Sequence, residues 1–228
     1  MKFIIIGLGN FGSSLAEKLT QTGHEVIGVD NKMNKVEALK ERLSHTVCLD
    51  CSDPQAVTHL PLKDTDIVIV CIGEDEGANI LTTALMKKLQ VKRLISRAVS
   101  PLHETVLEAM GVDEIVHPEE ETADRWAKKL NILGVVDSFE LTGDYNIIKA
   151  TVPKKYVGKS LLEVDFSKNF NVVVLTTIKV TEAKNLLGIT RKITRAQGVA
   201  TSKTVLDSGD LLVMYGNIND IERLLKGD

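Results

Sequence analysis

The stretch FIIIGLGNFGSSLAEKL, residues 3–19, places three glycines directly after a short apolar run and directly before a segment with helical spacing. Gly7, Gly9 and Gly12 form the pattern G-x-G-x-x-G. The first glycine of this pattern permits a tight turn, the second lets backbone approach a diphosphate, and the third allows a helix to pack closely on a strand. The helix then offers unpaired N–H groups and the positive end of its dipole. The stretch therefore predicts a strand, a phosphate-binding turn and a helix.

Two further acidic positions support this interpretation. The apolar run VIGVD ends at Asp30, eighteen residues after Gly12. A carboxylate there accepts hydrogen bonds from ribose hydroxyls and repels a 2′-phosphate. The next run ends in LDCSD, and we expect Asp50 or Cys51 beside an adenine, unless Asp53 merely caps the following helix. The set predicts a ligand of the adenosine diphosphate type, and the alternative is a glycine turn retained for packing.

The elements around this motif alternate regularly. Six apolar runs of strand length are separated by segments with helical periodicity, which is typical of a parallel sheet covered on both faces. We therefore predict an α/β fold, a doubly wound parallel-sheet Rossmann domain. The expected strands are Phe3–Ile6, Val26–Val29, Thr46–Leu49, Ile67–Ile72, Leu94–Ile95 and Ile115–Val116. The expected helices are Ser13–Gln21, Lys35–Leu43, Pro54–Leu60, Asn79–Leu89, Leu102–Met110 and Glu119–Leu130.

The remainder of the chain has a different pattern. Strand-like stretches dominate it, short turn signals such as TGD and DSGD separate them, and one helix is expected at its end. The expected elements are strands Ser138–Leu141, Asn146–Val152, Val172–Lys179 and Leu211–Tyr215 and helix Asp220–Lys226. We predict two domains, residues 1–134 with the Rossmann fold and residues 135–228 with a smaller α+β fold.

Composition excludes several classes of protein. The 228 residues carry a net charge of −3, so a general nucleic-acid binder is not expected. The longest apolar run, residues 67–73, is too short to span a bilayer, and a secretory leader is not expected. Three cysteines do not make a disulfide framework, and we interpret Cys48 and Cys51 as reduced thiols rather than a metal or redox pair. A cytoplasmic location is the simplest expectation.

An NAD-dependent oxidoreductase is the alternative function. Tyr145 and Lys149 have the spacing of a catalytic pair, but that pair needs a helix, and the segment GDYNIIKATV has the pattern of a strand. His117 follows the last strand of the first domain and is a candidate catalytic base or an ordinary loop residue. We therefore expect a protein that binds its nucleotide without chemistry.

The chain resembles a known family in both halves. FIIIGLGNFGSSLAEKL, VIGVD, DIVIVCIGEDEGANILTTALMKKL and GVDEIVHPEEETADRWAKKL follow the order of the RCK (KTN) N-terminal domain. The tail GKSLLEVDFSKNFNVVVLTTIK with LDSGDLLVMYGNINDIERL is similar to the RCK C-terminal domain. One copy of each domain resembles the cytosolic regulatory subunit of Ktr/Trk-type bacterial potassium uptake systems.

The resemblance implies a function and an assembly. Such subunits form dimers and then rings, often octamers, at the inner face of the cell membrane, beneath a separate potassium-transporting membrane subunit. Exchange of an adenine nucleotide, NAD for NADH or ATP for ADP, changes the shape of the ring. The helix over residues 119–130 is expected to cross to the dimer partner and to bury Trp126 there, although in a monomer this residue would belong to the core.

The resemblance also assigns site residues. Glu119 is expected to help a divalent cation at the terminal phosphate, or else to be a first-turn acid favoured by the helix dipole. Arg97 is expected to face phosphate, or else to be a surface residue that caps a helix. The nucleotide-binding set is Gly7, Gly9, Asn10, Phe11, Gly12, Asp30, Asn31, Lys32, Asp50, Cys51, Ile72, Gly73 and Arg97.

Three features depart from the family pattern. Many members have an arginine where this chain has Asn10, which supplies no charge, so a strong preference for ATP is not expected. Some relatives bind cyclic di-AMP in the second domain, but the expected arginine and asparagine pattern is not evident in residues 166–171, which leaves this ligand as a minor alternative. The hairpin over residues 180–203 is long and basic, and it is either a contact for a membrane protein or anionic surface or simply a solvated hairpin.

Overall fold

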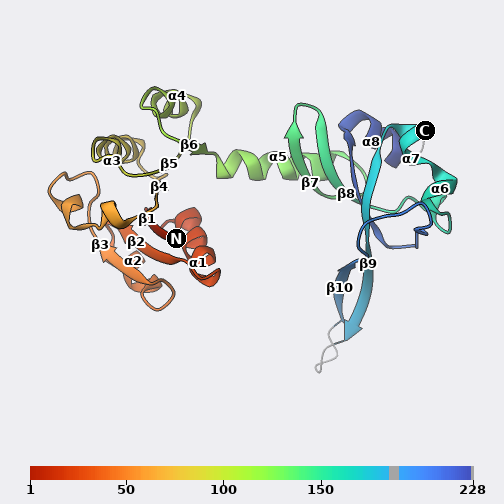
Figure 1. The fold of residues 1–228 in the computed structure, drawn as a ribbon, viewed down its shortest axis with the longest axis horizontal. Coiled ribbons are helices and arrows are strands. Elements are labelled where there is room, and N and C mark those ends of the chain that lie inside the picture. The colour runs from red at the N-terminus through yellow and green to blue at the C-terminus, as the bar shows by residue number, and fades with distance from the viewer. Residues whose placement is uncertain (185–189, 227–228) are drawn as a thin grey trace. The chain divides into compact units, whose positions relative to one another are not determined.

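The computed structural model describes residues 1–184 and 190–226 of the chain (Figure 1). The chain divides into two compact units, residues 1–119 and residues 120 onward. Helix α5 (Pro118–Asn131) begins at the end of the first unit, and strand β7 (Val135–Thr142) follows it. The predicted boundary after residue 134 thus lies between this helix and this strand. Among the described residues, no helix has the length and apolar character needed to cross a bilayer.

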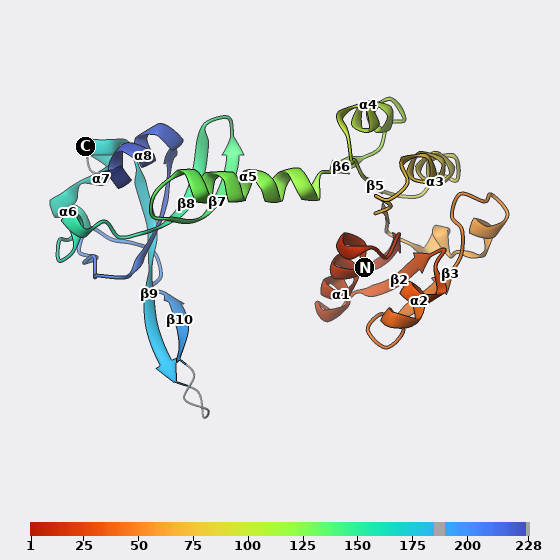
Figure 2. The ribbon, with the colours of Figure 1, turned by 180° about the vertical axis from the view of Figure 1, so that it is seen from behind.

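The first unit is a parallel sheet with helices on both faces, as predicted (Figures 1 and 2). Its six strands lie in the order β3-β2-β1-β4-β5-β6, so the order reverses between β1 and β4. In sheets of this kind ligands bind at that reversal, outside the carboxyl ends of the strands. The strands are β1 (Lys2–Ile6), β2 (Glu25–Asp30), β3 (His45–Cys48), β4 (Ile67–Val70), β5 (Leu94–Arg97) and β6 (Glu114–Val116). The helices are α1 (Asn10–Gln21), α2 (Met33–Leu39), α3 (Glu76–Lys88) and α4 (Pro101–Ala109).

Strand β1 shows why this sheet is covered on both faces. Phe3 and Ile5 belong to one hydrophobic cluster, and Ile4 and Ile6 belong to another. Successive side chains of a strand point to opposite faces, so an unbroken apolar run supplies two cores. All four side chains are buried.

One predicted helix is wrong. Residues 54–60 do not form an α-helix, and the structure has two short 3₁₀-helices, Ala56–His59 and Leu62–Asp64. Pro61 lies between them, and a proline disfavours helical backbone at the preceding residue. Leu60 accordingly has extended backbone, with φ −83° and ψ 141°. The segment between Pro54 and Pro61 is too short for more than one turn.

The second unit is a five-stranded antiparallel sheet with short helices, which confirms the predicted α+β class. Its strands lie in the order β10-β9-β11-β8-β7, and β9 and β10 form the hairpin predicted within residues 180–203. Part of that basic segment, residues 185–189, lies outside the described residues. The remaining elements are β8 (Tyr145–Thr151), β9 (Val173–Lys184), β10 (Thr190–Ala196), β11 (Leu211–Asn217), a 3₁₀-helix Lys154–Tyr156, α6 (Leu161–Val164), α7 (Phe166–Phe170) and α8 (Ile218–Lys226).

Helices α6 and α7 and the 3₁₀-helix Lys154–Tyr156 were not predicted from the sequence. Helix α6 begins with a capping box, in which the Ser160 hydroxyl accepts from the Glu163 N–H and the Glu163 carboxylate accepts from the Ser160 N–H. This S-x-x-E signal is visible in the sequence, but the helix spans only four residues, too few to show an apolar period.

The core of the unit lies under α8, where Ile221 and Leu224 are fully buried.

Candidate nucleotide-binding site

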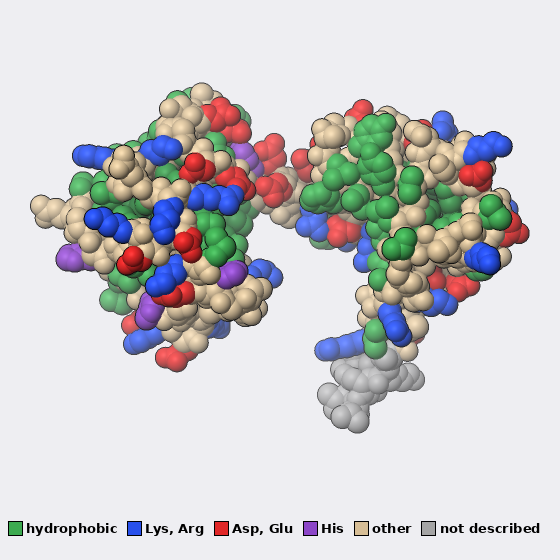
Figure 3. Space-filling view, viewed as in Figure 1, with side chains coloured by type: hydrophobic (Ala, Val, Ile, Leu, Met, Phe, Trp, Pro, Cys, Tyr) green, Lys and Arg blue, Asp and Glu red, His purple; other side chains and the backbone are tan. Residues whose placement is uncertain are grey.

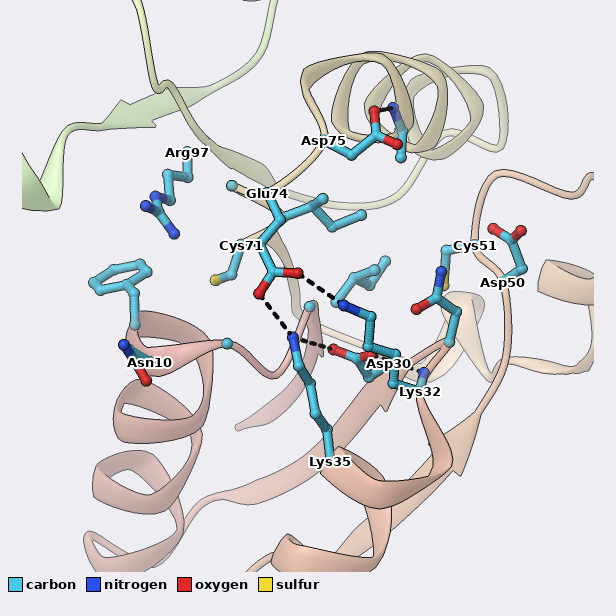
Figure 4. Close-up of a pocket in the computed structure, with 18 of the residues that line it drawn as sticks. Asn10, Asp30, Lys32, Lys35, Asp50, Cys51, Cys71, Glu74, Asp75 and Arg97 are labelled. Atoms are coloured by element: carbon cyan, nitrogen blue, oxygen red, sulfur yellow. Dashed lines mark hydrogen bonds and ion pairs between the residues drawn. The ribbon is translucent and has the colours of Figure 1, made fainter.

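A pocket of about 460 Å³ opens at the carboxyl edge of the first sheet, where the strand order reverses (Figure 4). The turn after β1, the loops after β2, β3, β4 and β5, and the first turn of α5 contribute to its wall. The lining residues are Ile6, Gly7, Gly9, Asn10, Phe11, Asp30, Asn31, Lys32, Lys35, Leu49, Asp50, Cys51, Cys71, Ile72, Gly73, Glu74, Asp75, Ala78, Arg97 and Glu119. The structure thus brings every predicted site residue except Gly12 to one cavity.

The glycine turn has the geometry that its sequence predicts. Gly7 has φ +95°, a conformation that residues with a side chain rarely adopt. A Cβ on Gly12 would lie 2.0 Å from the carbonyl oxygen of Gly7, so this residue keeps α1 close to β1 without lining the pocket. Gly9 is the N-cap residue of α1, and a Cβ there would meet open space. The start of α1 thus lies at the pocket, and Gly9 adds no side chain there, which suits a phosphate at the helix N-terminus.

Asp30 is buried against this turn. Its Oδ2 accepts a hydrogen bond from the Leu8 N–H at 2.8 Å, and its Oδ1 accepts from the Lys32 N–H at 2.9 Å. The carboxylate therefore joins the end of β2 to the glycine turn. Each carboxylate oxygen can accept more than one hydrogen bond, so Asp30 can also receive ribose hydroxyls.

A group of two lysines and one glutamate, not predicted as a unit, lies beside Asp30. Glu74 accepts from Lys32 Nζ at 2.9 Å and from Lys35 Nζ at 3.3 Å. The hydrogen bond with Glu74 raises the pKa of Lys32, and the bonds from both lysines lower the pKa of Glu74. This group links the loop after β2 to the loop after β4 across the pocket (Figure 4). Neither Lys35 nor Glu74 has a sequence signal, since their pairing depends on the fold.

The cysteines near the site are thiols. All three, Cys48, Cys51 and Cys71, are free. Burial raises the pKa of Cys51 and of Cys71 to about 12, so both are protonated and poorly nucleophilic at neutral pH. Asp50 beside them accepts from the Ser52 hydroxyl at 2.7 Å, and this bond lowers its pKa.

Asn79, from α3, fixes the far rim of the pocket. Its side-chain amide donates to the carbonyl of Ile72 at 2.8 Å and to that of Arg97 at 3.2 Å, and so joins the ends of β4 and β5. Its Oδ1 lies 3.1 Å from Ser96 Oγ and 3.1 Å from His103 Nε2. Burial lowers the pKa of His103. Because the amide oxygen of Asn79 can only accept, the ring nitrogen is the donor in this pair. Asn79 is fully buried, and sequence analysis did not single it out.

Arg97 closes the same rim. Its Nη2 donates to Glu119 Oε1 at 2.6 Å. Its guanidinium covers Gly73 so closely that a Cβ there would lie 2.5 Å from Arg97 Cζ.

The described residues contain no group of three histidine, cysteine, aspartate or glutamate side chains that could hold a metal. Glu119 is thus a single carboxylate paired with a guanidinium, which by itself does not fit a preformed cation site.

The candidate catalytic residues do not line the pocket. His117 Nε2 lies 3.3 Å from Glu104 Oε1, and neither is among the described lining residues. Tyr145 and Lys149 both lie in strand β8, as predicted, so they do not share a helical face.

Comparison with known proteins identifies the family. Residues 3–118 match the TrkA-N domain. The chain is 33% identical over 226 residues to the Ktr system potassium uptake protein C of Bacillus subtilis, an alignment that covers 99% of this chain and 96% of that protein. This chain belongs to the Ktr/Trk family of potassium uptake regulatory proteins. The Ktr system potassium uptake protein A of Vibrio alginolyticus is 28% identical over 227 residues, an alignment that covers 99% of this chain and 96% of that protein.

Solved structures share the fold of this Ktr/Trk family protein. The GsuK RCK domain superposes with a TM-score of 0.66 at 16% identity, covering 99% of this chain and 47% of that chain. The GsuK channel bound to NAD gives a TM-score of 0.65 at 17% identity, and the superposition covers 98% of this chain and 39% of that chain. The chain therefore spans less than half the length of these structures. A Rossmann-type sheet followed by an antiparallel α+β unit is thus an arrangement known from RCK proteins.

Proposed function

We propose that this protein is a cytosolic, nucleotide-sensing regulatory subunit of a bacterial potassium uptake system. It binds an adenine nucleotide in the pocket of the first unit and controls a separate potassium-transporting membrane subunit at the inner face of the cell membrane. One observation carries the proposal: the glycine turn, Asp30 and the loop at Asp50 meet in one cavity at the reversal of strand order. The near full-length match to Ktr proteins supports the potassium system.

The charges of the pocket favour a dinucleotide over ATP. Asp30, Asp50, Glu74, Asp75 and Glu119 line it, against Lys32, Lys35 and Arg97. Glu74 already pairs with both lysines. NAD and NADH carry less negative charge than ATP, so they meet less repulsion from these carboxylates. We accordingly infer that NAD or NADH binds at least as well as ADP or ATP.

Control of a partner requires two conformations. A ligand shifts an equilibrium only by its difference in affinity for the two states, so nucleotide exchange suffices and no chemistry on the nucleotide is needed. The membership of the chain in a family of regulatory proteins likewise supports binding without turnover. The oxidoreductase alternative has no support from the position of its candidate residues.

We further propose a homodimer that assembles into a ring, with eight copies as the expected number. None of the described residues of α5 is buried, and its Trp126 is 52% exposed. Hydrophobic side chains also gather on one face of the second unit (Figure 3). Exposed apolar side chains that gather on one face are typical of interaction sites. A dimer partner on α5 would remove Trp126 from water.

The proposal is tested by nucleotide binding and potassium uptake together. Purified protein is analysed by native mass spectrometry for retained nucleotide and titrated with NAD, NADH, ADP and ATP. The protein is then co-expressed with a Ktr-type membrane subunit in cells that lack potassium uptake. We expect adenine nucleotide binding and restored uptake only when both subunits are present. Uptake that is the same without this chain would contradict the regulatory role.

A further inference from the structure

Strands β9 and β10 extend beyond the sheet of the second unit as a two-stranded arm, residues 179–184 and 190–196 (Figure 1). Strand β9 pairs with β11 only as far as Ile178, and its later residues pair with β10 alone. Where the structure describes the exposure of the arm's side chains, Val180 is half-buried and the others are exposed. A pair of strands without a core is marginally stable in water. Packing within this unit therefore does not explain the arm.

The two faces of the arm differ in charge. Successive side chains of a strand point to opposite faces, and residues paired across two strands share a face. One face pairs Lys192 with Glu182, so its charges balance. The other face carries Arg191 and Arg195 from β10 and Lys179 from β9, and the described part of the arm adds no acidic side chain to it.

This basic face destabilises the free protein. Arg195 lies directly opposite Lys179, and like charges in that arrangement weaken a sheet. Asp207 pairs with Lys179 at 2.8 Å, whereas Arg191 and Arg195 form no ion pair with any residue that the structure describes. Ile193 lies between the two arginines on the same face and is 52% exposed. Charged side chains protect an edge strand such as β10 from pairing with other chains, but that protection does not explain an exposed isoleucine between them.

We propose that the basic face of the arm, formed by Lys179, Arg191, Ile193 and Arg195, binds the anionic headgroups of a phospholipid bilayer. The planar guanidinium groups fit phosphate oxygens, and the apolar side chain between them reaches the boundary of headgroups and acyl chains. An acidic protein surface matches the arginines but not Ile193, whereas a bilayer offers anions with apolar material directly beneath them. The inference goes beyond the proposed function, which needs contact with the membrane subunit only.

The arm gives this attraction a direction. The whole chain carries a net charge of −3, so an anionic bilayer repels the protein on average and attracts it at this face. Binding therefore turns the basic face of the second unit toward the membrane. The attraction weakens as salt is added, because the screening length shortens.

Binding of the full chain is measured by flotation with two kinds of vesicle, phosphatidylcholine alone and phosphatidylcholine with about one third phosphatidylglycerol. We expect binding to the anionic vesicles only. Arg191→Gln and Arg195→Gln should each lower the partition coefficient about three- to tenfold, the contribution of one basic residue near an anionic surface. Lys192→Gln removes the same charge from the other face and should change the coefficient less than about twofold.

A second pair of variants tests the apolar contact. Ile193→Thr keeps a β-branched side chain and every charge, and it should lower the partition coefficient about three- to tenfold. Val205→Thr is the matched control, because Val205 is 51% exposed and lies outside the arm. All these substitutions are at exposed positions, so each variant should fold as the wild type does.

Several results would overturn this inference. They are equal binding to both kinds of vesicle, an equal loss in Lys192→Gln, and displacement from anionic vesicles by inorganic phosphate at constant ionic strength, which would indicate a site for a free anion. Absence of vesicle binding would also overturn it, and a loss of potassium uptake in Arg191→Gln would then assign the face to the membrane subunit. None of these results bears on the nucleotide pocket, which calorimetric titration tests separately.

Discussion

Asp30 Oδ2 and the backbone N–H of Leu8 form a buried hydrogen bond of 2.8 Å. The residue expected to bind ribose thus also holds the turn expected to bind phosphate. The two parts of the site are coupled, because a ligand that pulls on Asp30 acts directly on the glycine turn. This contact lies between residues 22 positions apart in the sequence.

Replacement of Asp30 should therefore affect both affinity and stability. We expect Asp30→Ala to weaken binding of NAD or ADP by about 1.5–3 kcal/mol, since hydrogen bonds to a charged group are lost. The free energy of unfolding should fall by about 1–3 kcal/mol, because the Leu8 N–H is left without its partner. Calorimetry and urea unfolding measure the two effects. Unchanged nucleotide affinity would exclude the ribose assignment.

Asn10 offers a gain-of-function test. Without metal, ATP and ADP should bind within about tenfold of each other, a difference of about 1.4 kcal/mol or less. Asn10→Arg adds a cation at the start of α1 and should widen the difference in favour of ATP. Both nucleotides are titrated against wild type and variant, with and without Mg²⁺. An ATP preference above about a hundredfold in the metal-free wild type would contradict this account.

Asn79 should stabilise the ends of β4 and β5 at the rim of the pocket. Asn79→Ala leaves the carbonyls of Ile72 and Arg97 without a donor, and we expect a loss of about 2–4 kcal/mol in unfolding free energy. Asn34→Ala, at an exposed position of α2, is the control and should change stability by less than about 0.5 kcal/mol. Urea unfolding measures the change in unfolding free energy of both variants. Equal free energies of unfolding in Asn79→Ala and Asn34→Ala would show that the buried amide does not hold the rim.

His103 should make stability depend on pH. Burial lowers its pKa below the ordinary value of 6.5, so below that pH the unfolded chain binds a proton that the folded chain resists. Stability should therefore decrease as pH falls from 6.5 toward the lower pKa of the folded state, by at most about 1.4 kcal/mol per pH unit. His103→Gln should reduce this slope between pH 7.5 and 5.5. A slope that is the same in the variant would assign the dependence to other groups.

The exposed helix α5 predicts assembly. We expect light scattering of the native protein to give at least a dimer. Trp126→Glu should shift the equilibrium toward the monomer, because it places a charge where an apolar contact is proposed. Asn131→Glu, at an exposed position at the end of the same helix, is a control for charge alone. A wild type that is monomeric at micromolar concentration would reject this interface.

The first unit could be predicted because each part of its pattern has a local cause. Strand β1 is apolar at consecutive positions, which only a strand buried on both faces requires, and Gly7 and Gly12 fill positions where a Cβ would strain or clash. The glycine turn, Asp30 and Asp50 were predicted from motif spacing, whereas the family resemblance supplied the rest of the site; these residues lie together because loops after parallel strands meet at one edge of the sheet.

The parts that were not predicted depend on contacts between distant residues. Glu74 pairs with Lys32 and Lys35, which lie 42 and 39 positions away, and no spacing rule indicates this. Asn79 has the appearance of an ordinary polar residue of an amphipathic helix, and only the fold places it between two strand ends. Helix α6 was missed because four residues are too few for a period.

Binding at the glycine turn is tested most directly by calorimetric titration of NADH and ADP into the wild type and Gly9→Ala. Gly9 has ordinary backbone angles and its added methyl would meet open space, so the variant should fold as stably as the wild type. Ser14→Ala, at an exposed position of α1 outside the pocket lining, is the control. We predict binding to wild type and Ser14→Ala, and affinity at least about tenfold lower in Gly9→Ala, because the methyl separates backbone from diphosphate. Equal affinity in all three proteins, or no binding of either nucleotide to the wild type, would contradict the account.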